Sequence, residues 1–236
     1  MTVPVHPPPR TTVIVLAKAP LPGLAKTRLI PALGAAGAAA RAERLLDDAV
    51  DRALAARLGP VLLCGTPDVQ HPAFIRHAAR PGVALALQVG ADLGERMHHA
   101  LAGVLGLASP KTVPNTLPAA LPAPHQALLI GTDSPALSAC LLRQAAAALA
   151  TTDVVLVPAL DGGYALIGLH QPAPSLFTGM LWSTPQVLAS TRQRLAAAGL
   201  RHVELPAVQD IDEPADLAHL PAGWWVPYTP ARNTAP

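Results

Sequence analysis

Apolar strand-like runs that alternate with helix-like segments constrain the fold of this chain more than any other feature. Residues 12–17, TVIVLA, are β-branched and apolar on both faces, as expected of a central strand in a parallel sheet. An alanine-rich segment with charges at helical spacing, 35–58, predicts a long helix. Because this alternation continues, we expect an α/β protein with a mostly parallel central sheet and right-handed crossovers.

The same pattern predicts the remaining elements. Further strands are expected at 60–64, 83–89, 127–130, 154–157 and 203–205, with one more inside DGGYALIGL. Further helices are expected at 72–80, 94–107, 137–150 and 184–198, and DIDEPADL carries a helix start. Proline-rich composition predicts a disordered arm at 1–11, an exposed excursion at 108–125 and an extended tail at 221–236. The sequence therefore predicts one domain over 12–220.

Composition excludes several classes of function. With 236 residues, 51% of them hydrophobic and 14% charged, the chain can bury a sizeable core. Aromatic residues make up only 3% and the net charge is +2, which argues against a nucleic-acid partner. No apolar run reaches the length of a membrane span, and MTVPVHPPPR lacks a signal-peptide core. Two widely spaced cysteines favour a reducing compartment, so we expect a cytoplasmic protein without membrane insertion.

A cationic loop follows the first predicted strand and indicates a phosphate site. A P-loop requires G-x-x-x-x-G-K-[ST], but Pro20 and Ala25 stand at the two glycine positions, and proline has no N–H to donate. The alternative is a phosphate site made by side chains, in which lysine supplies a mobile positive charge and arginine supplies a planar guanidinium that matches phosphate oxygens. The candidate residues for binding a nucleotide phosphate here are Lys18, Gly23, Lys26 and Arg28. A solvated cationic turn is the competing interpretation.

Acidic residues follow other predicted strands. Asp133, in LLIGTDSP, suits a ligand of Mg²⁺ or Mn²⁺, although an Asx-turn or a helix cap at Ser134–Pro135 is equally consistent. Asp161 opens DGGY, which is either an ordinary turn or a ligand-facing loop. Tyr164 then either stacks on a ligand or packs in the interior.

Two further acidic segments have both a structural and a functional interpretation. In DIDEPADL, Asp212 before Pro214 resembles a helix N-cap, but it supplies a second metal carboxylate if the turn folds back beside Asp133. In QVGADLGERM, Asp92, Glu95 and Arg96 surround a helix N-terminus, where free N–H groups favour an anion. In the competing interpretation, Asp92 caps that helix, and Glu95 and Arg96 are exposed to solvent.

The position of these segments after strands predicts that they meet. Parallel sheets bind ligands at the carboxyl ends of their strands. The cationic loop, GTDSP and DGG each follow a predicted strand, so we expect them to converge at one edge of the sheet.

Six ordered motifs resemble a known family. VLAKAPLPGLAKTRL, QVGADLGERM, LLIGTDSPAL, VPALDGGYALIGL, LWSTPQVL and DIDEPADL resemble the bacterial GT-A-like glycosyltransferases associated with radical-SAM, selenium or arsenosugar gene contexts. That family is similar to small nucleotidyltransferases, such as phospholactate guanylyltransferase and molybdenum cofactor guanylyltransferase. The resemblance covers roughly residues 12–220 and implies a single-domain, three-layer nucleotide-diphospho-sugar transferase fold.

The resemblance also implies roles for individual residues. Lys26 and Arg28 would contact nucleotide phosphates, and residues 92–96 would border the base or ribose. Asp133 would bind the divalent cation, with Asp212 completing the metal site. Asp133 and Asp161 would be the catalytic residues. Gly162, Gly163 and Tyr164 would face the donor sugar or the acceptor.

Three functions follow as hypotheses. The first is metal-dependent glycosyl transfer from a nucleotide-diphosphate sugar to a small-molecule acceptor. The second is guanylyl- or cytidylyl-type nucleotidyl transfer that releases pyrophosphate, kept open because no D-x-D triplet follows a predicted strand. The third is a nucleotide-binding protein without catalysis.

Overall fold

The structure, a computed structural model, describes residues 10–106, 125–221, 223 and 224. Residues 1–9 of the predicted arm, residues 108–124 of the predicted excursion and most of the predicted tail lie outside the described residues. The strands are β1 (Arg10–Lys18), β2 (Val61–Thr66), β3 (Val83–Leu87), β4 (His125–Ile130), β5 (Val154–Pro158), β6 (Tyr164–Leu169) and β7 (His202–Glu204). The α-helices are α1 (Ile30–Ala56), α2 (Pro72–Ala78), α3 (Leu93–Val104), α4 (Ala139–Ala148) and α5 (Val187–Ala197). Three short 3₁₀ helices complete the described elements: η1 (Thr27–Leu29), η2 (Pro174–Leu176) and η3 (Pro214–His219).

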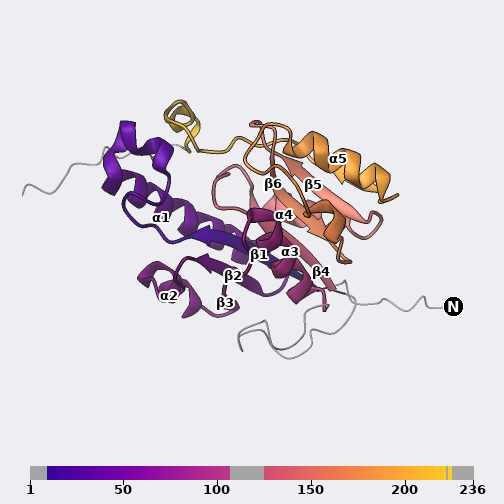
Figure 1. Cartoon of the computed structure of the whole chain (residues 1–236). Coiled ribbons are helices and arrows are strands. Elements are labelled where there is room, and N and C mark those ends of the chain that lie inside the picture. Colours follow the sequence, from indigo (N-terminus) through magenta and orange to yellow (C-terminus); the bar gives the residue numbers. More distant parts are fainter. Residues whose placement is uncertain (1–9, 107–124, 222, 225–236) are drawn as a thin grey trace, which may run out of the picture.

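The strands form one twisted sheet in the order β3-β2-β1-β4-β6-β5-β7 (Figure 1). β1 pairs in parallel with β2 and β4, β2 with β3, and β5 with β7. β6 runs antiparallel to both β4 and β5. The predicted α/β fold with a mostly parallel sheet is confirmed.

Helices cover both faces of the sheet, which makes three layers. Val13 and Val15 of β1 point to one face and pack in a cluster with side chains of α1, α2 and α4. Ile14 of the same strand points to the other face, where its cluster includes side chains of α3 and α5. This two-sided burial explains why β1 has almost no polar alternation. No helix in the described part of the chain has both the length and the apolarity to cross a bilayer.

Several element boundaries differ from the sequence-based predictions. β1 begins at Arg10 rather than Thr12, so two residues of the predicted arm belong to the sheet, where Thr11 Oγ1 donates to buried Gln126 Oε1 at 3.1 Å. β4 likewise begins at His125, inside the predicted excursion. α1 begins at Ile30 because Pro31 suits a first helical turn, and a kink at Gly34 (φ 70°) separates that turn from the helix predicted at 35.

The helix after GTDSP also starts later than predicted. α4 begins at Ala139, capped by Ser138, whose Oγ accepts the Leu141 N–H at 3.2 Å, and not at Ser134–Pro135. The cap interpretation of the GTDSP turn is therefore wrong, and Asp133 lies in a loop between the strand and this helix.

Candidate functional site

The strand order places a ligand site between β1 and β4. β2 and β3 lie on one side of β1, and β4 and the remaining strands lie on the other side. The strand order therefore reverses direction between β1 and β4. Ligands of open α/β sheets bind at such a switch point, outside the carboxyl ends of the strands. The cationic loop follows β1, and the Asp133 loop follows β4.

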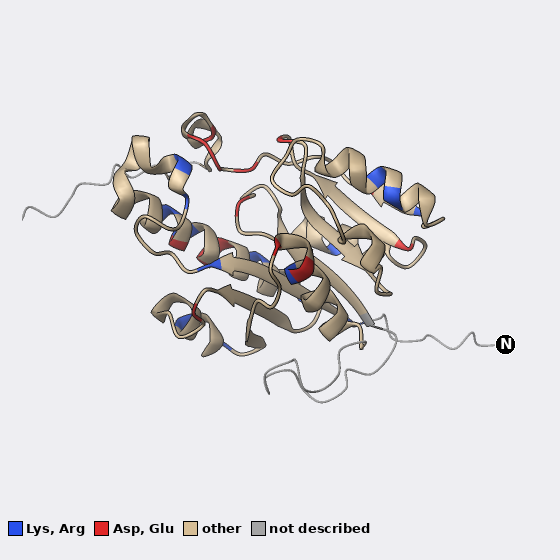
Figure 2. Cartoon of the chain, viewed as in Figure 1, with Lys and Arg blue, Asp and Glu red and all other residues tan. Residues whose placement is uncertain are grey.

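A cleft of about 780 Å³ opens at this end of the sheet, in the size range of small-molecule sites. The cationic loop, GTDSP and DGG all contribute to its lining, so the predicted convergence of these three loops is observed. Residues of DIDE line the same cleft. The charged residues that line it are Lys18, Lys26, Arg28, Arg96, Asp133, Asp161, Asp210, Asp212 and Glu213. Figure 2 shows acidic segments on the loop after β4 and on the chain leading to η3, on the same side of the sheet.

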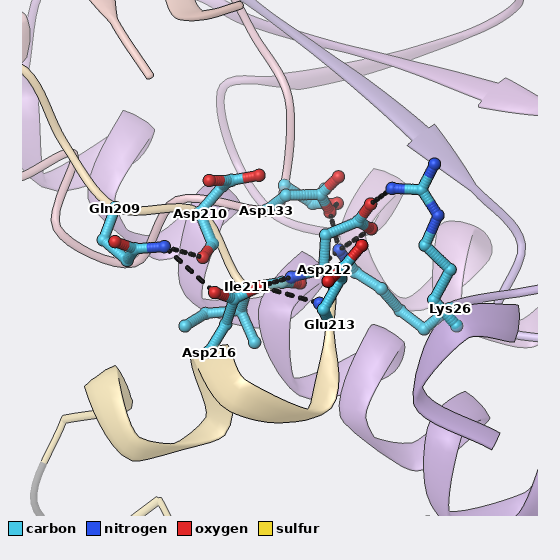
Figure 3. A network of polar contacts seen from close by, with 10 residues as sticks. Lys26, Asp133, Gln209, Asp210, Ile211, Asp212, Glu213 and Asp216 are labelled. Atoms are coloured by element: carbon cyan, nitrogen blue, oxygen red, sulfur yellow. Dashed lines mark hydrogen bonds and ion pairs between the residues drawn. The ribbon is translucent and has the colours of Figure 1, made fainter. Parts of the chain in front are cut away.

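Lys26 joins the two carboxylates predicted to bind metal. Its Nζ lies 2.8 Å from Asp133 Oδ1 and 3.4 Å from Asp212 Oδ1, and it donates to Ile211 O at 2.6 Å (Figure 3). Arg28 Nη1 donates to the other oxygen of Asp212 at 2.6 Å. The basic side chains of the first loop and the Asp133 carboxylate therefore share one site.

The cationic loop holds Lys26 inward through buried apolar neighbours. Ala25 and Leu29 on either side are buried, and the Ala25 N–H donates to Leu21 O at 3.0 Å. Lys26 itself has φ 49° and ψ 46°, the left-handed conformation that a non-glycine residue rarely adopts. Gly23 also has a positive φ, of 81°, but it does not line the cleft. Its part is to permit the turn.

Asp212 reaches the site because the turn before η3 folds back onto the loop after β4. The Ile211 N–H donates to Asp133 O at 2.8 Å, and Ile211 is buried. Asp216 Oδ2 accepts the N–H groups of Asp212 and Glu213 at 3.0 and 2.7 Å. The N-cap of η3 is thus Glu213 and not Asp212, which frees the Asp212 carboxylate for the cleft.

Arg52 of α1 also holds the loop after β4. Its Nη1 donates to Ser134 O at 3.0 Å and to Leu137 O at 3.3 Å, and its guanidinium is ion-paired with Asp48. Burial lowers the pKa of Arg52, while Asp48 opposes that shift. Within the helical pattern of 35–58, nothing in the sequence separates this arginine from its neighbours.

The α3 segment contributes less to the site than expected. Asp92 caps α3, since its Oδ1 accepts the Glu95 N–H at 2.8 Å, and Glu95 Oε2 accepts the Ala91 N–H at 2.8 Å. The Asp92 carboxylate therefore takes one of the first-turn N–H groups of α3, and neither Asp92 nor Glu95 lines the cleft. Arg96 does line it, with its Nε donating to Gly90 O at 3.1 Å.

Gln88 is a cleft residue that the sequence reasoning missed. Its Nε2 donates to Ala17 O and Cys64 O at 2.9 and 2.8 Å, which fixes the amide across the ends of β1 and β2. It was hidden inside the strand predicted for 83–89, whereas β3 ends at Leu87. A polar residue at the end of an apolar run is the signal that could have identified it.

The DGG loop forms the other side of the cleft. Asp161 Oδ1 accepts the Gly163 N–H at 2.8 Å, so the predicted turn is present, and Asp161 and Gly163 also line the cleft. Gly162 does not line it; a Cβ there would lie 2.2 Å from Pro185 O, so this glycine permits close packing against the loop before α5. Tyr164 lines the cleft but packs with the apolar cluster under α3, and burial raises its pKa.

Asp210 is a cleft carboxylate whose pKa is raised. Burial, and then the nearby charge of Asp161, raise its pKa to about 6. Figure 3 shows its carboxylate directed away from the Lys26 contacts.

The carboxylate pair fits the chemistry of a small divalent cation. Mg²⁺ is usually held by one or two carboxylates and completes its shell with water and substrate phosphate. Asp133 and Asp212 supply such a pair on one side of the cleft. Among the described residues, no group of three or more His, Cys, Asp or Glu side chains is placed to hold a metal ion.

The fold is nucleotide-diphospho-sugar transferase-like. The chain belongs to the family described as an uncharacterized protein conserved in bacteria (DUF2064), whose profile matches residues 49–184. The matched segment contains Asp133 and the DGG loop. No curated protein matches the chain significantly.

Solved structures show the same fold. A candidate nucleotide-diphospho-sugar transferase from Desulfovibrio desulfuricans G20 is 28% identical, with a TM-score of 0.73 over 87% of this chain and 83% of that one. A CMP:2-keto-3-deoxy-manno-octonic acid synthetase complexed with CTP is 10% identical, with a TM-score of 0.53 over 89% of this chain and 96% of that one. A 4-diphosphocytidyl-2C-methyl-D-erythritol synthase from Anaerococcus prevotii DSM 20548 is 8% identical, with a TM-score of 0.56 over 90% of this chain and 97% of that one.

Proposed function

We propose that this chain is a metal-dependent glycosyltransferase that uses a nucleotide-diphosphate sugar as donor and a small molecule as acceptor. One observation carries the proposal: the Lys26 ammonium lies 2.8 Å from Asp133 and 3.4 Å from Asp212 at the switch point of the sheet. Cations suited to phosphate oxygens and carboxylates suited to a divalent ion thus occupy one site. The 28% identity to a candidate nucleotide-diphospho-sugar transferase supports this class of donor.

The residues divide the cleft by chemistry. Lys26 and Arg28 would hydrogen-bond the oxygens of the donor diphosphate, and Asp133 and Asp212 would hold Mg²⁺ or Mn²⁺. When bound, that ion offsets the negative charge that develops on the departing diphosphate. Lys18, Gln88 and Arg96 border the nucleoside half of the cleft.

Asp161 and its neighbours serve the acceptor half. One carboxylate oxygen of Asp161 is fixed by the Gly163 N–H, and this bond sets the position of the side chain. Asp161 takes the proton of the acceptor hydroxyl. The acceptor oxygen bonds to the anomeric carbon of the donor sugar, and the bond from that carbon to the diphosphate breaks. Gly163 and Tyr164 face the donor sugar or the acceptor.

Nucleotidyl transfer is the second candidate. It is favoured by the placement of Asp133 and Asp212 on two separate loops rather than in one D-x-D triplet. In this reaction an acceptor oxygen attacks the α-phosphorus of a nucleoside triphosphate, and pyrophosphate leaves. The same cations and carboxylates would serve it.

A ligand screen followed by product analysis tests these proposals. Thermal unfolding is measured with nucleoside diphosphates, nucleoside triphosphates and nucleotide sugars, each with Mn²⁺ or Mg²⁺, because a ligand that binds the folded state raises the melting temperature. The selected compound is then incubated with candidate acceptors. Release of nucleoside diphosphate indicates glycosyl transfer, and release of pyrophosphate indicates nucleotidyl transfer.

Matched variants connect the result to this cleft. Asp133→Asn is expected to abolish the metal-dependent part of the thermal shift. The control Asp51→Asn removes an exposed carboxylate on α1 that pairs with Arg80, outside the cleft. An unchanged shift in Asp133→Asn would remove Asp133 from the site, and binding without turnover would favour a non-catalytic nucleotide-binding protein.

A further inference from the structure

The Lys26 ammonium already satisfies the carboxylates that the proposed function gives to a metal ion. Only 7% of its side chain is exposed, and its Nζ contacts Asp133 Oδ1, Asp212 Oδ1 and Ile211 O. An ammonium has three N–H donors, so these oxygens account for its full capacity. Asp133 and Asp212 are more exposed, at 48% and 36%, so the cleft gives access to the pair from the solvent side.

The charges in direct contact balance. Asp133 and Asp212 carry two negative charges, and Lys26 and Arg28 carry two positive charges. A divalent ion added to this group would face an ammonium held against the same oxygens, and like charges at such a distance repel strongly in a partly buried site. A diphosphate group brings the negative charge that offsets the ion and also offers acceptors to Lys26 and Arg28.

The backbone at Lys26 is consistent with a side chain held by its contacts. A left-handed conformation disfavours residues with a Cβ, and Lys26 has no side-chain capping bond to the 3₁₀ helix that follows. The contacts with Asp133, Asp212 and Ile211 O act together with the buried neighbours of Lys26 to hold the ammonium inward.

We propose that Lys26 is a positioning residue that keeps Asp133 and Asp212 paired in the free protein, so that a divalent ion binds the two carboxylates only together with a diphosphate group that draws the ammonium away. This inference rests on the proposed function, because it assigns the same two carboxylates to the ion. It adds an order to ligand binding: the metal ion does not bind ahead of the nucleotide.

Titration of the full chain with Mn²⁺ alone, followed by the electron paramagnetic resonance signal of the free ion, tests the inference. Wild-type protein is expected to bind Mn²⁺ weakly. Lys26→Met keeps most of the apolar stem, and Lys26→Gly suits the left-handed backbone, so two variants with different effects on folding remove the same charge. Both are expected to bind Mn²⁺ at least about tenfold more tightly than wild type.

Three controls separate charge from general perturbation. Lys26→Arg keeps the charge and is expected to bind Mn²⁺ as weakly as wild type. Asp133→Asn combined with Lys26→Gly is expected to lose the gain. Arg192→Met removes an exposed cation paired with Glu204, outside the cleft, and should have no effect. A purely structural role for Lys26 would leave the Mn²⁺ affinity unchanged or lower it.

The result can be separated from that of the nucleotide assays. Equal Mn²⁺ affinity of wild type, Lys26→Met and Lys26→Gly overturns the inference, whatever nucleotide the protein binds. A gain in both variants supports it even where no donor sugar is turned over. In a further arm, wild type dialysed against Mn²⁺ with inorganic pyrophosphate is expected to retain the ion, and failure there would count against both this inference and the proposed function.

Discussion

At the scale of single residues, Asp210 shows how the cleft sets the chemistry of a carboxylate. Its pKa rises to about 6 because it is partly buried and lies near Asp161. The folded protein thus binds this proton more tightly than the unfolded chain, whose aspartates titrate near 3.9. Folding is favoured by this group below the unfolded value, and the contribution is lost as the pH rises through about 6.

Asp210→Asn is therefore expected to stabilise the metal-free protein at neutral pH. The amide cannot ionise, so the free energy of unfolding should increase by about 1 kcal/mol at pH 7.5 after allowance for solvent screening. Below about pH 4 the wild-type carboxyl is itself protonated and the gain should vanish. Urea unfolding at both pH values, with a chelator present, measures this. A gain that is the same at both pH values would contradict the electrostatic explanation.

Residue types and positions alone predicted part of the site. Lys26, Arg28 and Asp133 follow predicted strands, Asp212 is predicted to join them if its turn folds back beside Asp133, and the structure brings these residues into contact. Asp92 and Glu95 are predicted to lie near an anion at a helix N-terminus, but in the structure Asp92 caps α3 and Glu95 accepts the Ala91 N–H. A carboxylate that caps and one that faces a ligand look alike in sequence, because the difference depends on which backbone N–H groups lie within reach.

At the scale of elements, Asp216 organises the turn that carries Asp212. It accepts the N–H groups of Asp212 and Glu213, and its Oδ1 accepts Gln209 Nε2 at 3.1 Å. These bonds fix the chain between the last strand and η3 over the cleft (Figure 3).

Asp216→Ala is expected to destabilise the protein by about 1–2 kcal/mol, as for the loss of a helix cap. It should also reduce the thermal shift produced by Mn²⁺ with nucleotide, because Asp212 loses its support. The control Asp68→Ala removes a carboxylate that accepts one backbone N–H, from Gln70, in an exposed turn. Thermal unfolding with and without ligand separates the two effects, and equal ligand shifts in both variants would argue against a role for this turn in binding.

Gly162 and Gly179 test the packing of the DGG loop against the loop before α5. Both have positive φ, but a Cβ at Gly162 would meet Pro185 O at 2.2 Å, whereas Gly179 has open space. Gly179→Ala is expected to cost about 1–2 kcal/mol from the left-handed backbone alone. Gly162→Ala should cost about 3 kcal/mol or more, because a backbone atom must also move. Equal losses in urea unfolding would show that the close contact is unimportant.

The order and type of the elements were easier to predict than their ends. The apolar run of β1 and the helical pattern of α1 are long enough to identify, but the α1 boundary depends on Pro31 and on the kink at Gly34. The antiparallel direction of β6 has no local signal, because strand direction is set by how the chain returns across the sheet. Only the second half of DIDEPADL lies in a 3₁₀ helix, η3, whose N-cap is Glu213 in a capping box with Asp216.

At the scale of the whole molecule, the site is assembled from segments that are distant in sequence. The chain after β7 passes over the switch point and packs on α1, where Ile211 and Leu217 join Leu29 and Leu45 in one apolar cluster. Figure 1 shows this carboxyl-terminal segment beside the first half of α1. The sequence indicated that the loops meet at one edge of the sheet. The position of the carboxyl-terminal segment on α1 depends on long-range packing that no single motif encodes.

The most direct test of the central claim is a crystal structure of the full chain with Mn²⁺ and the nucleoside diphosphate that gives the largest thermal shift. We expect anomalous density for the ion at coordinating distance from the carboxylates of Asp133 and Asp212, with the diphosphate oxygens on Lys26 and Arg28. A diphosphate bound elsewhere, or an ion that contacts neither carboxylate, would contradict the account.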